Sequence, residues 1–336
     1  MRLLVTGGCG FIGSTFVRMA LSRGHQVTNL DKLTYAGNPA NVAEVADLPG
    51  YRFLHADIAD AAAVANALEG VDVVVNMAAE SHVDRSILDP ATFPMTDVVG
   101  TAVILDQSRR AGVRRFVQVS TDEVYGSIPH GAFRETDPLE PSSPYSASKA
   151  GGDLQALAWH RTYGLDVVVT RGSNTYGPRQ YPEKLIPLFV TNALDGEGLP
   201  VYGDGQQIRD WIHVEDHCAG IFAVLEHGAA GEVYNVGGGN ERTNLDITER
   251  ILGLTGRNGA LIHHVTDRPG HDRRYALATE KLSTLGWTAR VEFATGLADT
   301  VEWYRANRAW WEPIKSGEYR AYYQAQYGDR GSAPRA

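Results

Sequence analysis

Short apolar runs alternate with amphipathic stretches through the first half of the chain. This alternation predicts six strands, at Arg2–Thr6, Gln26–Leu30, Tyr51–His55, Val71–Met77, Phe116–Ser120 and Val167–Thr170. It also predicts helices between most of these strands, at Ile12–Arg23, Ala61–Glu69, Thr101–Arg110 and Ser146–Tyr163. Because apolar strands that alternate with helices form a parallel sheet covered on both faces, we expect a doubly wound α/β fold.

The pattern changes after about Arg171, where the segments become shorter and richer in Gly, Pro and Asn. We therefore expect a smaller second α/β domain assembled from non-contiguous pieces. The first domain is predicted to comprise residues 1–171 plus roughly 212–236, and the second residues 172–211 and 237–328. The polar residues 329–336 are expected to form a disordered tail.

Composition argues against several classes of protein. The chain has 336 residues, of which 43% are hydrophobic and 21% charged, as in ordinary globular proteins. A net charge of -9 with scattered basic residues argues against binding of nucleic acid, which needs a concentrated basic patch. The sequence shows neither a secretory signal nor an apolar run near the roughly 20 residues that span a bilayer. We expect a cytoplasmic protein with no membrane partner.

A glycine-rich turn joins the first predicted strand to the first predicted helix. Gly7, Gly10 and Gly13 allow a tight turn, close approach of a pyrophosphate, and close packing of the helix on the strand. The start of the helix then offers N–H groups and a positive dipole end to phosphates. A glycine triplet alone indicates only a turn, but its place between a strand and a helix predicts a Rossmann-type dinucleotide site.

The ends of the next strands carry residues suited to the rest of a dinucleotide. Asp31 follows the second strand and can accept hydrogen bonds from both adenine-ribose hydroxyls. Because its carboxylate would repel a 2′-phosphate, we predict NAD rather than NADP, although the neighbouring Lys32 weakens this preference. Asp57 could meet the adenine edge, and a helix N-cap is an equally good interpretation of it. Ala78 and Ala79 are small enough for a cofactor to lie against the backbone.

Tyr145 and Lys149 are spaced i, i+4 at the start of a predicted helix, so they share one face. A lysine ammonium beside a phenol lowers the pKa of the phenol and suits it to act as a base toward a hydroxyl. Such a pair is often only part of an exposed helix face. The preceding nucleotide motif in an alternating α/β chain favours the catalytic interpretation.

The segment Ser120-Thr121-Asp122-Glu123-Val124-Tyr125-Gly126 lies at the carboxyl end of the fifth strand, where ligands bind in open parallel sheets. Two adjacent carboxylates at such an edge raise one another's pKa values through burial and repulsion. One is then suited to act as a general acid and its neighbour as a base. The alternative is a pair of acidic residues that stabilises a helix N-terminus.

Nine segments together resemble a known family: GGCGFIGS (7–14), DKLTYAGN (31–38), AAESHVDRSI (78–87), STDEVYG (120–126), PSSPYSASKA (141–150), YPEKLIP (181–187), YGDGQQIRDWIHVEDH (202–217), RPGHDRRY (268–275) and TVEWY (300–304). Over nearly the whole chain, to about Tyr327, the sequence is similar to the dTDP-glucose 4,6-dehydratases, which are extended short-chain dehydrogenases/reductases. The segment STDEVYG distinguishes this family from the related 4-epimerases.

The resemblance implies that dTDP-glucose is converted to dTDP-4-keto-6-deoxyglucose, with NAD as cofactor, for deoxysugar biosynthesis. Tyr145, activated by Lys149 and helped by Thr121, would remove the O4 proton while C4 gives its hydride to NAD. Glu123 would remove the C5 proton, and Asp122 would protonate the departing C6 hydroxyl. Return of the hydride to C6 would regenerate the cofactor in each cycle.

The resemblance also implies which residues hold the ligands. Those expected to contact NAD are Gly7, Gly10, Phe11, Ile12, Gly13, Asp31, Lys32, Thr34, Asp57, Ile58, Ala78, Ala79, Ser81, Thr96, Tyr145 and Lys149. Those expected to contact the nucleotide sugar are Ser81, Thr121, Asn174, Glu183, Lys184, Leu185, Ile186, Tyr202, Arg209, Asn244, Arg268, His271 and Arg273. Of these, Arg209 and Arg273 suit a diphosphate, because a guanidinium matches the geometry of its oxygens.

A homodimer is implied as well, in which the helices Thr101–Arg110 and Ser146–Tyr163 of two copies form a four-helix bundle. The chain departs from the family at Asp97, where asparagine is common, and at Thr175, which replaces the second asparagine of an S-N-N-Y-G-P segment. Either residue could tune substrate preference.

Parts of the sequence are also compatible with two other functions. A 4-epimerase or decarboxylase acting on a UDP-sugar is one alternative, but simple epimerisation needs no chemistry at C5 and leaves Asp122 and Glu123 unexplained. A catalytically silent NAD-binding regulator is another, although such a protein would be expected to have lost part of the catalytic set. The paired histidines 213/217 and 263/264 lack carboxylate or thiol partners at ligand spacing, so we predict no metal site.

Overall fold

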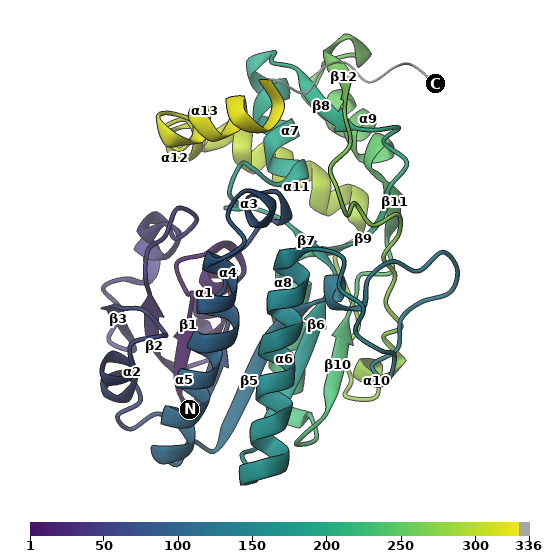
Figure 1. Cartoon of the computed structure of the whole chain (residues 1–336). Helices are drawn as coiled ribbons and strands as arrows, with labels where there is room; N and C mark the ends of the chain where they lie inside the picture. Colours follow the sequence, from purple (N-terminus) through teal and green to yellow (C-terminus); the bar gives the residue numbers. More distant parts are fainter. Residues whose placement is uncertain (329–336) are drawn as a thin grey trace.

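The protein consists of a large parallel sheet flanked by helices and a smaller group of elements at the carboxyl ends of its strands (Figure 1). The description rests on a computed structural model and covers residues 1–328. The predicted tail, residues 329–336, lies outside the described residues. Within residues 1–328, no helix is long and apolar enough to cross a membrane.

The large sheet has seven parallel strands in the order β10-β6-β5-β4-β1-β2-β3. Its strands are β1 (Arg2–Thr6), β2 (Gln26–Asp31), β3 (Tyr51–His55), β4 (Val73–Asn76), β5 (Arg115–Thr121), β6 (Val167–Gly172) and β10 (Val233–Val236). The strand order reverses between β1 and β4, which creates a crevice at the carboxyl ends of the strands. The predicted doubly wound, Rossmann-type fold is confirmed.

All six predicted strands are present within two residues of their expected limits, and β10 is an unpredicted seventh. β10 is only four residues long and pairs with β6, with Val233 opposite Val169. Its partner strand lies more than 60 residues earlier in the chain, so no local pattern marks the pairing.

Helices cover both faces of this sheet. On one face, α1 (Phe11–Ser22) and α8 (Val214–His227) pack together, with Phe16 stacked on Phe222 at 4.2 Å between ring centroids. On the other face lie α2 (Ala61–Ala67), α5 (Thr101–Arg110) and α6 (Pro144–Tyr163). Between β4 and α5 the chain forms two short helices and a π-helical turn, namely α3 (Val83–Leu88), α4 (Thr92–Pro94) and η2 (Met95–Gly100).

The smaller group has its own apolar core, which is built from α7 (Leu185–Asp195), α9 (Asn244–Thr255) and α11 (Phe293–Ala306). Two small sheets accompany these helices, with strand orders β11-β9-β7 and β12-β8. Their strands are β7 (Asn174–Tyr176), β8 (Leu199–Tyr202), β9 (Ile208–His213), β11 (Glu241–Thr243) and β12 (Ile262–Val265). The remaining elements are η1 (Pro39–Val45), η3 (Asp122–Tyr125), η4 (Gly259–Leu261), α10 (Glu280–Ser283), α12 (Arg308–Trp311), α13 (Glu318–Tyr323) and η5 (Gln324–Gly328).

A buried ion pair ties the end of the sheet to the turn η3. Arg171 on β6 donates from Nε to Oδ2 of Asp153 on α6 at 2.9 Å and from Nη1 to the Tyr125 hydroxyl at 2.8 Å. Tyr125 in turn donates to Oδ1 of Asn235 on β10 at 2.8 Å. These bonds join β6, α6, η3 and β10, so they fix the position of the residues that follow β5.

We predict that Arg171→Ala destabilises the protein by about 3–5 kcal/mol, because it leaves the Asp153 carboxylate buried without its partner. Urea unfolding followed by circular dichroism measures the change in the free energy of unfolding. Arg110→Ala, which removes an exposed i, i+4 pair with Asp106, serves as the control and should change it by less than about 0.5 kcal/mol. Equal, small effects of both variants would contradict the prediction.

Candidate active site

The glycine-rich turn between β1 and α1 leaves room for a ligand because side chains are kept out of it. Gly7 has a φ of +68°, and a Cβ there would lie 2.9 Å from the backbone of Ala78. A Cβ on Gly13 would lie 2.1 Å from the carbonyl oxygen of Gly7. Gly10, at the N-cap position of α1, provides no side chain to cap the helix. The first N–H groups of α1 therefore remain available to an anion.

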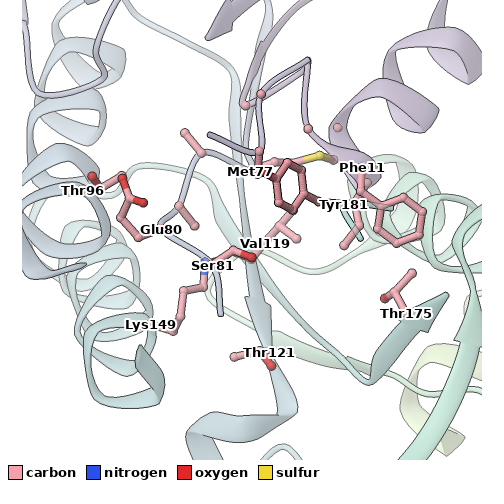
Figure 2. Close-up of a pocket in the computed structure, with 18 of the residues that line it drawn as sticks. Phe11, Met77, Glu80, Ser81, Thr96, Val119, Thr121, Lys149, Thr175 and Tyr181 are labelled. Carbon is pink, nitrogen blue, oxygen red and sulfur yellow. The ribbon is translucent and has the colours of Figure 1, made fainter. Parts of the chain in front are cut away.

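One cavity extends from this turn along the carboxyl ends of the strands to the predicted catalytic residues. Figure 2 shows its lining, with Phe11 and Met77 on one side and Thr121 and Lys149 on the other. Every residue that was expected to contact NAD lies in its wall. The cavity therefore brings together residues from loops and helices that are distant in the sequence.

Asp31 connects the glycine turn to the loop after β2. Its Oδ2 accepts a hydrogen bond from the Cys9 N–H and its Oδ1 one from the Leu33 N–H, each at 2.8 Å. Burial raises the pKa of Asp31, and these two backbone N–H groups oppose the shift. The carboxylate thus holds two loops in place and keeps further lone pairs for the hydroxyls of a ribose.

Lys32 and Asp57 form an ion pair, with 2.6 Å between Nζ and Oδ2. Asp57 also accepts a hydrogen bond from the Ala59 N–H at 2.9 Å. The alternative reading of Asp57 as a helix N-cap is wrong, since Asp60 caps α2 by accepting from the N–H groups of residues 62 and 63. Because Lys32 is held by Asp57, it does not offset the charge of Asp31 directly.

The predicted acid–base pair lies on η3, a turn of four residues directly after β5. Thr121 caps this turn: its Oγ1 accepts from the Glu123 N–H at 3.3 Å and donates to Oδ1 of Asp122 at 3.2 Å. A four-residue 3-10 turn has too few aligned peptides for a substantial dipole, so stabilisation of a helix terminus does not explain the two carboxylates.

The surroundings of the two carboxyl groups differ. Burial raises the pKa of Asp122 well above its usual value, and the charges of Glu123 and Asp210 raise it further. Burial also raises the pKa of Glu123, but three cations oppose this effect, namely Lys184, Arg268 and Arg209. Ionisation is therefore easier for Glu123 than for Asp122.

Tyr145 and Lys149 lie on the first turns of α6, which begins with a capping box formed by Ser143 and Ser146. The Lys149 ammonium is buried and donates to the Val119 carbonyl oxygen at 3.0 Å. The pKa of Tyr145 is raised well above its usual value, first by burial and then by the charges of Glu123, Asp97 and Asp122. The expected lowering of this pKa is thus not present, because burial of the phenol and the three nearby carboxylates all raise it.

A second cavity adjoins the first and is formed mainly by the smaller group of elements. Four residues belong to the walls of both cavities: Glu123, Asn174, Glu183 and Lys184. The second cavity is otherwise lined by these residues from the predicted nucleotide-sugar set: Leu185, Tyr202, Arg209, Asn244, Arg268 and His271. Glu123 therefore lies where the predicted cofactor site and the predicted sugar site meet.

The arginines of the second cavity are held by polar partners and rings. Arg209 donates from Nη2 to the Asp272 carbonyl oxygen at 2.9 Å and lies 4.2 Å from the centroid of the Tyr275 ring. Arg268 pairs with Asp84, with 3.0 Å between Nη1 and Oδ1. Burial opposes ionisation of Asp84, but His82 and Arg268 outweigh it and lower the pKa of Asp84 to about 2. These contacts hold positive charge in position for an anionic ligand.

Two members of the predicted sugar set lie elsewhere. Arg273 is more than half exposed and pairs with Asp204 at 2.9 Å, outside the walls of both cavities. Ile186 is buried in the apolar core of the smaller group, because neighbouring residues on α7 face different sides. A guanidinium matches a diphosphate chemically, but the fold turns the Arg273 side chain toward solvent.

The structure adds residues to the site that the sequence did not single out. Glu80 and Tyr181 line the first cavity and Tyr275 the second. Arg85 donates to Oε2 of Glu183 at 2.7 Å and lies 3.6 Å from the centroid of the Tyr35 ring. The available signal was their presence in the segments DKLTYAGN, AAESHVDRSI, YPEKLIP and RPGHDRRY. Among residues 1–328, no group of three or more His, Cys, Asp or Glu side chains is arranged to hold a metal ion.

Comparison with known proteins places these features in a family context. A family model described as GDP-mannose 4,6 dehydratase matches residues 4–300. A dTDP-glucose 4,6-dehydratase of Streptomyces niveus is 58% identical over 323 residues, which cover 94% of this chain and 96% of the relative. A dTDP-glucose 4,6-dehydratase of Escherichia coli K12 is 47% identical and covers 98% of this chain and 100% of its own length.

Solved structures of related enzymes are also similar to this chain. The crystal structure of DesIV, a dTDP-glucose 4,6-dehydratase from Streptomyces venezuelae with NAD and TYD bound, is 56% identical with a TM-score of 0.93 and covers 94% of this chain and 100% of that one. A UDP-glucose 4-epimerase from Thermus thermophilus in complex with NAD is 33% identical with a TM-score of 0.86, covering 91% and 100%.

We predict that Asp31→Ala weakens the binding of NAD by about 10- to 100-fold, since a charged hydrogen-bond acceptor contributes about 1.5–3 kcal/mol. Calorimetric titration of the protein, after removal of any co-purified nucleotide, measures the dissociation constant. Glu69→Gln, at an exposed position after α2, is the matched control. An unchanged affinity in Asp31→Ala would contradict the role of this carboxylate.

Proposed function

Since the chain belongs to the GDP-mannose 4,6 dehydratase family, we propose that the residues around Glu123 carry out the 4,6-dehydration of dTDP-glucose. The reaction converts dTDP-glucose to dTDP-4-keto-6-deoxyglucose, a step of deoxysugar biosynthesis, with NAD as the cofactor. The observation that carries the assignment of roles is the position of Glu123 in the walls of both cavities, beside a more deeply buried Asp122.

The first cavity suits NAD in shape and chemistry. The glycine turn excludes side chains where a pyrophosphate would lie, and the uncapped N-terminus of α1 supplies N–H donors. Asp31 supplies acceptors for ribose hydroxyls and disfavours a 2′-phosphate. Hydride transfer from C4 of the sugar and back to C6 is the chemistry that NAD would supply when bound in this cavity.

Tyr145 removes the proton from the sugar O4 as C4 is oxidised. Burial and the carboxylates disfavour the phenolate, whereas the Thr121 hydroxyl favours it when it donates to Tyr145 instead of to Asp122. A protonated Asp122 removes one of these opposing charges. The protonation states of Asp122 and Tyr145 are therefore coupled. A proton on Asp122 makes this residue a general acid and also favours the phenolate form of Tyr145.

Asp122 and Glu123 then act on C6 and C5. The ketone at C4 acidifies the C5–H bond, and Glu123, whose charge Lys184, Arg268 and Arg209 stabilise, accepts that proton. Asp122, whose protonated form burial favours, gives its proton to the C6 hydroxyl, and the C6–O bond breaks to release water. Glu123 returns its proton to C5, and the proton gained by Tyr145 replaces the one lost by Asp122. The site thus ends in its starting protonation state.

We also propose that two parts of the chain bind the two ligands. Residues 1–171 with roughly 212–236 would bind NAD, and residues 172–211 with 237–328 would bind the nucleotide sugar. The second cavity supports this division, because its cations come mainly from the later segments: Lys184, Arg209 and Arg268. A soluble, cytoplasmic location accords with the biosynthetic reaction.

We also propose that two copies form the homodimer expected from the resemblance, through α5, α6 and η2. Three large apolar side chains are exposed in this region: Leu154 at 59%, Met95 at 56% and Val99 at 43%. η2 packs against α6, so these residues belong to one layer of the molecule. Pairing with a second copy would remove them from water.

The dimer proposal predicts that Leu154→Glu shifts the protein toward a monomer, because a charge would be buried in the interface. Sedimentation velocity at several concentrations measures the distribution. Leu254→Glu, at an exposed leucine on α9, is the matched control and should leave the distribution unchanged. The proposal fails if both variants sediment like the unmodified protein.

The assignment of the base predicts that Glu123→Gln lowers the rate of water loss by about 10²- to 10⁴-fold, since an amide cannot accept the C5 proton. Oxidation at C4 should persist, so reduced NAD should accumulate in a single turnover. Mass spectrometry of the sugar product and absorbance of the cofactor separate the two steps. Glu140→Gln, at an exposed loop position, is the control. Full turnover by Glu123→Gln would contradict the assignment.

A further inference from the structure

The π-helical turn η2 is pressed closely against α6, one turn after the pair Tyr145–Lys149. A Cβ on Gly151 would lie 2.7 Å from Cγ2 of Val98, and a Cβ on Gly152 would lie 2.7 Å from the carbonyl oxygen of Asp97. The two glycines thus permit a backbone approach that other residues would prevent. Such single π-helical turns are frequent at functional sites.

At this contact the Asp97 side chain points toward α6. It is 2% exposed, and its Oδ2 accepts a hydrogen bond from the Ser148 hydroxyl at 2.6 Å. Ser148 lies between Tyr145 and Lys149 on α6, and its hydroxyl is also 2.8 Å from the Tyr145 carbonyl oxygen. Asp97 therefore binds the turn of α6 that carries both residues.

The charged and titratable groups that face Asp97 come from two elements. From α6 these are the Lys149 ammonium and the Tyr145 phenol, and from the loop after β4 the Glu80 carboxyl, which is hydrogen-bonded to Thr96. The pKa of Asp97 is raised to about 6, mainly by burial and further by the charge of Glu80, against the opposing effects of Lys149, the Ser148 hydroxyl and the Glu80 N–H. The charge on Asp97 in turn raises the pKa of Tyr145.

We propose that Asp97 is a positioning residue that holds Ser148 and opposes the charge of Lys149, so that its own ionisation controls how readily Tyr145 acts as the base. This inference rests on the proposed function. Asparagine at this position could make the same hydrogen bond but carries no charge. A carboxyl here therefore adds a pH response that an amide would lack.

The direction of the pH response follows from the negative charge of the ionised Asp97 carboxylate. Below about pH 6 Asp97 is protonated, and the enzyme should behave like an Asp97→Asn variant. Above about pH 6 the ionised carboxylate makes the phenolate less stable, so a smaller fraction of Tyr145 should be available as the base than in the variant. The difference should disappear again at alkaline pH, where the phenolate is fully formed in both proteins.

The test is the pH profile of kcat/KM for dTDP-glucose, measured on the NAD-loaded protein and on Asp97→Asn. The ratio of variant to wild type should rise across pH 6 by about tenfold, which corresponds to a change of about one unit in the pKa of Tyr145. Thermal unfolding of both proteins shows whether the isosteric variant keeps its fold.

Ser148→Ala supplies a second comparison that keeps the carboxyl. Loss of the Ser148 hydrogen bond should raise the pKa of Asp97. The ratio of kcat/KM between the double variant, Ser148→Ala with Asp97→Asn, and Ser148→Ala alone should therefore rise at a pH above 6. Parallel pH profiles in both comparisons, with turnover reduced by a constant factor, would mean a purely structural role and overturn the inference alone. Absence of dehydration by the wild type at every pH would overturn the proposed function and this inference together.

Discussion

Burial of negative charge at the carboxyl end of β5 is the constraint on which the active site depends. Asp122 is 1% exposed, and its neighbour Glu123 lies at the junction of two cavities. Two buried carboxylates in adjacent positions are tolerated only if one stays protonated or cations compensate the other. The structure uses both solutions, since Asp122 has the less favourable surroundings for a charge and Glu123 the more favourable.

The cations that stabilise Glu123 come from segments at least 60 residues later in the chain, at positions 184, 209 and 268. They have to be held in place themselves, and Asp84 does this for Arg268 while Asp272 does so for Arg209 through its carbonyl oxygen. The smaller group of elements is therefore more than a cover over the sheet. Its folding against the β4–α5 connection completes the electrostatic environment that separates the acid from the base.

The features of the site that depend on local sequence were predictable. The strands, the glycine turn and the Thr121–Glu123 segment at the end of β5 follow from apolar periodicity and motif position. Features set by long-range pairing were not: β10 has its partner more than 60 residues away, and Arg273 pairs with Asp204 instead of facing a cavity. The π-helical form of η2 also left no periodic signal, because it is a single turn inside a helical stretch. Side-chain chemistry predicts what a residue can bind, whereas its direction depends on the fold around it.

The most direct test of the account uses dTDP-glucose that carries deuterium at C4, incubated with the purified protein and a catalytic amount of NAD. The account predicts a product lighter by one water that keeps the deuterium, now in the C6 methyl group, without accumulation of reduced NAD. Nuclear magnetic resonance locates the label, and mass spectrometry reports the water. A product of unchanged mass with inverted C4 would show an epimerase, and loss of the deuterium to solvent would contradict the transfer of hydride from C4 to C6.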